Sequence, residues 1–116
     1  MEVWVSVSGE KRKYQGSFRS VMEKIALEGK DKDLKLLSIH APKKELRRFK
    51  RNLRAYSKDL FKTANEIAKW FYQKEYRKLS RLSKELRKKT DPQSAERYSK
   101  IQEELSQVKE KLSALS

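Results

Sequence analysis

The sequence predicts an α+β fold, in which a small N-terminal ββαβ unit precedes a long basic helix and a C-terminal antiparallel helical hairpin. Residues 2–8 alternate between valine and other residues, and such a period of two is typical of a half-buried strand. Hydrophobic residues recur every three or four positions between residues 46 and 71 and again between residues 98 and 115, which is typical of amphipathic helices. The predicted segments are the α+β unit 1–41, the basic helical segment 42–89 and the heptad helix 90–116.

The first two strands are predicted from alternation and a turn. Val3, Val5 and Val7 share one face of the first strand, and Trp4 lies on the other face, where we expect it to pack rather than to stack on a ligand. Gly9 supplies a turn, and residues 11–16 are interpreted as a second, short strand that closes a hairpin.

A helix and a third strand complete the N-terminal unit. Ser17 is a suitable N-cap, and Gly29 is well placed to end the helix. The helix has one apolar face, which consists of Phe18, Val21, Met22 and Ile25. The apolar residues 34–41 predict a strand that stops before Pro42. Because three short strands and one helix form a small core, we expect downstream residues to pack on this unit.

Residues 42–89 predict either one very long helix or two helices. Pro42 suits the first position of a helix, and no further Gly or Pro occurs before Asp91. An unbroken helix over this whole segment would exceed the usual length in globular proteins. Thr63 and Glu66 match a capping box, so a break near Thr63 and a continuous helix both remain open.

The last helix is predicted to begin at Asp91 and Pro92 and to present a heptad seam. The seam residues are Tyr98, Ile101, Leu105, Val108, Leu112 and Leu115. Their expected partners on the preceding helix are Tyr76, Leu79, Leu82 and Leu86. A short loop between long helices favours an internal hairpin. If the seam were exposed instead, it would bind a protein partner or a second copy of the chain.

The net charge of +14 is concentrated in the middle of the chain. Residues 41–89 carry eighteen basic and five acidic residues, a net charge of +13, whereas residues 1–40 carry +2 and residues 90–116 carry −1. Such asymmetry is expected of a face that binds a polyanion. The candidate nucleic-acid-binding residues are Lys43, Lys44, Arg47, Arg48, Lys50, Arg51, Arg54, Lys74, Arg77, Lys78, Arg81, Lys84, Arg87 and Lys88.

A charged helical face is more often simply solvated, but the charges of residues 43–54 are not mixed. Seven basic residues stand against Glu45 alone, and like charges four positions apart repel each other in a helix. Nearby, residues 70–72 are three consecutive aromatic residues, so at least one ring should lie near solvent. A ring beside a lysine could stack on an unpaired base, although covering the N-terminal strands is the role that we favour for Trp70 and Phe71.

Composition argues against an enzyme. The chain has no Cys, and His40, its one histidine, has no acidic neighbour in sequence. There is no spaced acidic cluster for Mg²⁺ and no glycine-rich phosphate loop. We therefore expect no catalytic residue, no metal and no cofactor. The lack of Cys, the few Asn residues and the many Lys, Glu and Arg residues fit a thermophilic source.

The sequence thus predicts a small, basic, non-catalytic protein that contacts the phosphate backbone of DNA or RNA with low sequence specificity. The absence of a long apolar run or a signal-like N-terminus indicates a cytoplasmic protein without a membrane partner. The alternative is a structural subunit or accessory factor of a larger nucleoprotein complex, which would bind a protein through the C-terminal seam.

Overall fold

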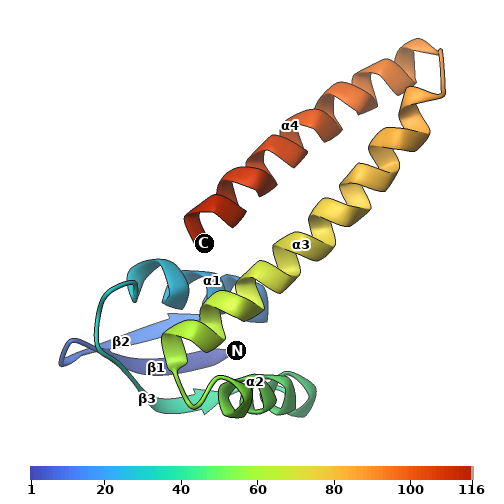
Figure 1. Ribbon diagram of the computed structural model, residues 1–116. Coiled ribbons are helices and arrows are strands. Elements are labelled where there is room, and N and C mark those ends of the chain that lie inside the picture. Colours follow the sequence, from blue (N-terminus) through green and yellow to red (C-terminus); the bar gives the residue numbers. More distant parts are fainter. Residues whose placement is uncertain (116) are drawn as a thin grey trace. The chain divides into compact units, whose positions relative to one another are not determined.

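The computed structural model describes residues 1–115 and confirms the predicted α+β class (Figure 1). The elements in chain order are β1 (Glu2–Val7), β2 (Glu10–Gln15), α1 (Phe18–Glu28), β3 (Leu34–His40), α2 (Lys43–Ala55), α3 (Leu60–Arg87) and α4 (Pro92–Leu115). The chain divides into two compact units, which are Met1–Ala68 and Lys69–Ser116. We call them the N-terminal unit and the hairpin unit.

The three strands form one antiparallel sheet in the order β2-β1-β3. Ser8 and Gly9 connect β1 to β2 with φ angles of 51° and 87°. Positive φ at both central residues is the geometry of a type I′ turn, which matches the twist of a two-residue hairpin. The register of β1 against β3 shifts between Trp4 and Val5, where β3 carries an extra residue.

One face of the sheet is buried by helices. Val3, Val5 and Val7 are at most 2% exposed, as alternation in β1 predicted. The helices contribute buried side chains of their own, namely Phe18, Val21, Met22, Ile25, Phe49, Leu60, Ala64, Ile67 and Ala68. The expectation that downstream residues complete the N-terminal core is therefore confirmed, and Phe49 of α2 is the fully buried member of its helix.

Helix α1 has the predicted ends. The backbone N–H of Ser20 donates to the Ser17 hydroxyl at 3.1 Å, and the Gly29 N–H donates to the Ile25 carbonyl at 2.8 Å. Gly29 does not adopt a left-handed backbone conformation, because its φ is −90°. A glycine is needed here because a larger residue has no space. A Cβ at this position would overlap the Leu34 side chain and would lie 2.6 Å from the Ile25 carbonyl oxygen.

The basic segment is broken, but four residues before the predicted position. Helix α2 ends at Ala55, and the Lys58 and Ser57 N–H groups donate to the carbonyls of Leu53 and Arg54 at 2.7 and 3.2 Å. This pair of bonds is the Schellman motif, with Ser57 in the left-handed position where glycine is usual (φ 54°).

Asp59, rather than Thr63, caps the next helix. The Lys62 N–H donates to the Asp59 carboxylate at 3.0 Å. The buried Thr63 hydroxyl instead donates to the Asp59 carbonyl at 2.7 Å, inside the first turn of α3. Thr63 and Glu66 resemble a capping box in sequence, yet the chain is already helical there. Pro42 was predicted to be the first helical residue of α2, but it directly precedes that residue.

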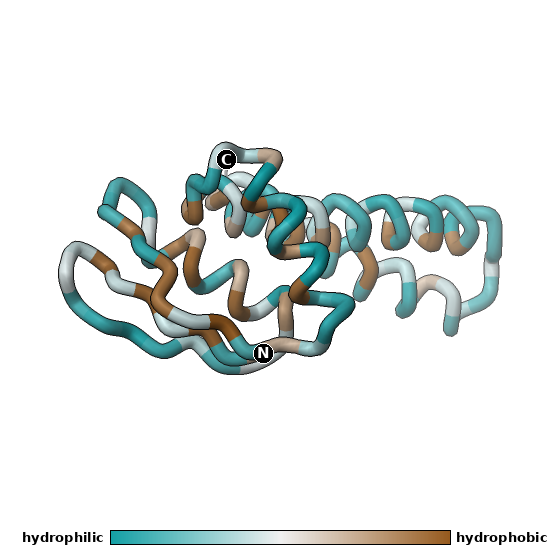
Figure 2. Tube along the Cα trace, turned by 90° about the horizontal axis from the view of Figure 1, so that it is seen from below, coloured by the Kyte–Doolittle hydropathy of each residue, from teal (hydrophilic) through white to brown (hydrophobic). Residues whose placement is uncertain are grey.

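The hairpin unit consists of α3 from Lys69 onward and α4, joined by a short loop, as predicted. Asp91 caps α4, because the Ser94 N–H donates to its carboxylate at 2.9 Å, and Pro92 is the first helical residue. In Figure 2 the hydrophobic positions of both helices are separated by hydrophilic stretches. This is the pattern of two amphipathic helices that share one narrow seam.

Candidate nucleic-acid interface

The basic face of α2 is set by the anchoring of Phe49. Phe49 is buried, and Leu46 and Leu53 on the same side of α2 are partly buried. Because the helix has 3.6 residues per turn, Arg47, Arg51 and Arg54 lie on the opposite side. These three arginines are exposed and extend over about 10 Å of the helix axis. Within residues 1–115 none of them makes a salt bridge.

Nearly all predicted binding residues of α2 reach solvent. The exposed ones are Lys43, Lys44, Arg47, Lys50, Arg51 and Arg54. Arg48 is half-buried and has an interaction partner, so it contributes less to the face than the sequence suggested. Its carbonyl accepts a hydrogen bond from the Asn52 side chain at 2.9 Å. We call the six exposed residues the α2 basic face.

A second group of basic residues lies on α3 and directly after its last residue, in the hairpin unit. All of its predicted members are exposed, namely Lys74, Arg77, Lys78, Arg81, Lys84, Arg87 and Lys88. Arg87 donates to the Tyr98 hydroxyl of α4 at 3.3 Å. This hydrogen bond raises the pKa of Arg87 and, because a neighbouring cation favours the phenolate, lowers the pKa of Tyr98. Arg87 therefore also ties the two helices together.

The aromatic cluster of α3 has one exposed ring, as expected. Trp70 is 39% exposed, Phe71 is half-buried and Tyr72 is buried. Trp70 and Phe71 meet edge to face with ring centroids 5.0 Å apart, and the Lys74 ammonium lies 5.1 Å from the Trp70 centroid. Trp70 is thus partly exposed and lies next to a cation of the second basic group.

The predicted seam of α4 is used largely inside the hairpin. Leu105, Val108 and Leu115 are buried, whereas Tyr98, Ile101 and Leu112 are half-buried. On α3, Leu79 is buried as predicted, but Leu82 is 38% exposed. Ser83 takes the inner position and accepts a hydrogen bond from the Gln102 amide at 2.8 Å. Ser83 thus contributes to the contact between the helices in addition to the predicted residues, and the sequence did not indicate it because a serine gives no hydrophobic signal.

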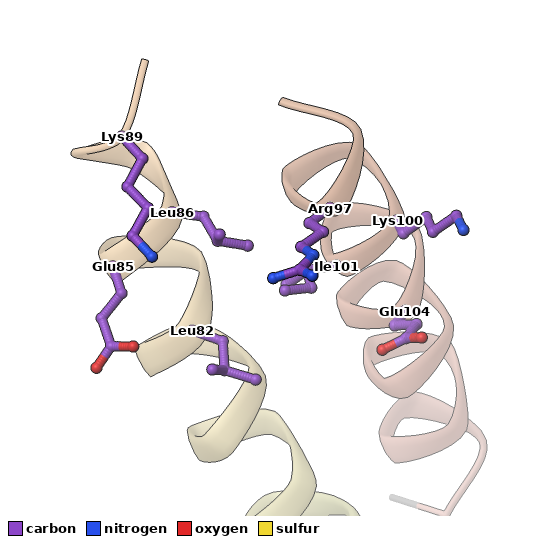
Figure 3. A pocket seen from close by; sticks show the side chains of 8 residues that line it. All are labelled: Leu82, Glu85, Leu86, Lys89, Arg97, Lys100, Ile101 and Glu104. Carbon is purple, nitrogen blue, oxygen red and sulfur yellow. The ribbon is translucent and has the colours of Figure 1, made fainter. Parts of the chain in front are cut away.

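Near its loop the hairpin has a groove of about 410 Å³ (Figure 3). Leu82 and Leu86 of α3 and Ile101 of α4 point into the space between the helices, whereas Glu85 and Lys100 point away from it. The rim carries both signs of charge. An apolar floor with such a rim is suited to a side chain of a protein partner rather than to a polyanion.

Sequence reasoning missed a third basic surface, on the face of the sheet that the helices leave uncovered. Trp4 is 36% exposed there, contrary to the expectation that it packs. Lys11, Lys13 and Lys35 are exposed on the flanking strands, and so is His40. The alternation of Lys11, Lys13 and Gln15 in β2 is the signal that could have revealed this face.

No group of three or more His, Cys, Asp or Glu side chains in residues 1–115 could hold a metal ion. In the same residues, no helix is both long enough and apolar enough to cross a membrane.

Comparison with known proteins gives a family but not an activity. The chain is 48% identical, over an alignment of 118 residues, to a protein of Aquifex aeolicus (strain VF5) named "Uncharacterized protein". The alignment covers 99% of this chain and 93% of the Aquifex protein. This small basic α+β protein with a helical hairpin therefore belongs to the same family as the Aquifex protein. No family model matches the chain, and no solved structure matches it.

Proposed function

We propose that the protein binds nucleic acid, DNA or RNA, through the phosphate backbone and without catalysing a reaction. The observation that carries the proposal is the α2 basic face, where Arg47, Arg51 and Arg54 are exposed and make no salt bridge within residues 1–115. Arginine suits this role because its planar guanidinium donates several hydrogen bonds to phosphate oxygens. The exposed cations of α3 supply further contacts in the hairpin unit.

The mechanism is release of the counterions that surround the nucleic acid. Each phosphate that a lysine or arginine neutralises releases bound cations, so affinity falls as salt rises. Phosphate contacts carry no sequence information by themselves, so base specificity should be low. The proposal needs neither a cofactor nor a membrane, and it places the protein in the cytoplasm.

The test is a titration of labelled duplex DNA, single-stranded DNA and structured RNA at several salt concentrations. The variant combines Arg47→Gln, Arg51→Gln and Arg54→Gln, because glutamine keeps helix propensity and removes the charge. We expect weaker binding to every sequence and a salt slope that is flatter by roughly one unit per lost phosphate contact.

A matched control removes three charges elsewhere in the N-terminal unit. Lys24, Lys30 and Lys32 are exposed on and after α1, among acidic neighbours, so their replacement by glutamine lowers the net charge equally. Equal weakening by the two triple variants would mean that net charge, not the α2 basic face, sets the affinity. A wild-type protein that binds none of the three ligands more tightly than about 10⁻⁴ M at physiological salt contradicts the proposal.

A second candidate is an assembly role in a larger nucleoprotein complex, and the hairpin groove favours it. Leu82 is 38% exposed in that groove, although most of the predicted seam is consumed within the hairpin. A protein partner or a second copy would cover this side chain. This role would replace the first proposal if no nucleic acid binds, and a molecular mass above that of the monomer in solution would support it.

A further inference from the structure

The uncovered face of the sheet combines one aromatic ring with several cations. Directly opposed residues in an antiparallel pair lie on the same face, with Cβ atoms about 5 Å apart. Trp4 is opposed by Lys13 on β2 and by Ser38 on β3. Ser6, the next residue of β1 on this face, is opposed by Lys11 and Lys35. Trp4 thus stands on the central strand opposite one lysine, and the next residue on its face has a lysine on both sides.

The ring of Trp4 is held in place by its neighbours. Its indole N–H donates to the Glu2 carboxylate at 3.1 Å, and the Lys13 ammonium lies 3.6 Å from the same carboxylate oxygen. The Lys13 ammonium is also 5.8 Å from the centroid of the Trp4 ring. A ring whose edge is tied by a hydrogen bond loses little freedom when a ligand stacks on it, so less of the binding energy is spent on ordering.

The charge of this face is complementary to a polyanion. Lys11, Lys13 and Lys35 outnumber Glu2, and that acid is already engaged by Trp4 and Lys13. The far end of β3 carries the exposed His40, and Lys43 and Lys44 of the α2 basic face follow it by three and four residues in the chain. Figure 1 shows β3 leading directly into α2.

We infer that the uncovered sheet face binds single-stranded nucleic acid, with an unpaired base stacked on Trp4 and with Lys11, Lys13 and Lys35 on the flanking phosphates. The inference rests on the proposed function and names its substrate class. A base inside a duplex has both faces covered by its neighbours, so stacking selects single strands, whereas the α2 basic face accepts any phosphate backbone. Base stacking on an aromatic side chain tolerates every base, which agrees with low sequence specificity.

The experiment compares three polyanions on the full chain. They are an oligothymidine of about twelve nucleotides, within the usual site size of a single-strand binder, a duplex of equal length, and inorganic polyphosphate, which has charge but no bases. Trp4→Ala should weaken single-strand binding by about five-fold or more while leaving duplex and polyphosphate binding unchanged. Trp4→Phe, which keeps a ring, should retain most of the single-strand affinity.

The control removes an exposed apolar side chain that has no ring. Leu37 of β3 is exposed, and Leu37→Ala should leave binding of all three ligands unchanged. Trp70→Phe leaves Trp4 as the sole tryptophan, so its fluorescence reports stacking even if Trp4→Ala fails to fold. Oligothymidine should quench this fluorescence, and polyphosphate should not.

The outcomes separate this inference from the proposed function. Duplex binding together with absent single-strand quenching overturns the sheet-face inference and leaves the α2 basic face in place. Equal weakening of all three ligands by Trp4→Ala also overturns it, because the ring would then act through stability or charge. Failure of the wild type to bind any of the ligands overturns both.

Discussion

Helices α2 and α4 are both amphipathic, yet they arrange their charges in opposite ways. On α2, Lys43, Arg47 and Arg51 follow one another at intervals of four residues and all carry the same sign. On α4, Glu96, Lys100 and Glu104 have the same spacing and alternate in sign. Opposite charges at this spacing stabilise a helix by a few tenths of a kcal/mol per pair, and like charges destabilise it by similar amounts.

The difference shows which surface serves the fold and which does not. The charges of α4 are arranged as helix stability requires, since the helix carries four basic and four acidic residues. The charges of α2 work against its own helix, so folding does not explain them. Helix α2 is instead held by burial of Phe49, which leaves its outer face exposed.

The largest effect on stability is expected from removal of the buried Phe49 side chain. Phe49→Ala removes a fully buried ring and should lower the free energy of unfolding by about 3–5 kcal/mol, through lost burial and the remaining cavity. Urea denaturation followed by circular dichroism measures the change. Lys50→Ala, at the exposed neighbouring position, should stay within about 0.5 kcal/mol of the wild type. Similar values for the two variants would mean that Phe49 does not anchor α2.

A smaller change in stability, of opposite sign, is expected when arginines on the outer face of α2 are replaced. The triple variant Arg47→Gln, Arg51→Gln and Arg54→Gln removes three like-charge pairs at i,i+4 and should raise the free energy of unfolding by about 1 kcal/mol at low salt. The gain should shrink at high salt, because exposed charges are screened. Thermal unfolding at two ionic strengths measures it. A loss of stability would show that these arginines support the fold, and the contrast with α4 would fail.

The smallest effect concerns the starts of the two helices. Pro42 offers α2 no side-chain acceptor, whereas Asp91 accepts the Ser94 N–H, and its hydrogen bonds with Ser94 hold its pKa below the ordinary value of 3.8. Because the folded pKa is depressed, this contribution to stability is complete above pH 3.8 and is lost as the pH falls through the folded pKa.

An NMR titration of the Asp91 carboxyl group checks this expectation. Asp91→Asn keeps an oxygen that can cap α4 but does not titrate, so the acid-dependent part of hairpin stability should disappear in this variant. An Asp91 carboxyl group that titrates at or above 3.8 would contradict the capping geometry.

Local patterns in the sequence determined most of the elements. Alternation around Val3, Val5 and Val7 specified β1, because successive side chains of a strand point to opposite faces. Ser17 and Asp91 marked two helix starts correctly, since an N-cap needs only a short side chain that accepts a neighbouring N–H. The exposure of nearly every basic residue of α2 and α3 also followed from local spacing, once the hydrophobic stripes were identified.

Three features were decided by tertiary structure. The break between α2 and α3 has Ser57 in the left-handed conformation, and a serine does not indicate this conformation as clearly as a glycine would. Thr63 matches the sequence pattern of an N-cap but lies inside the first turn of α3. Ser83 faces α4 together with Leu82, because the packing of two helices selects a side by geometry and not by hydrophobicity alone. Trp4 remains exposed because the helices cover the other face of the sheet. Which face they cover depends on contacts between distant residues, and no local pattern contains them.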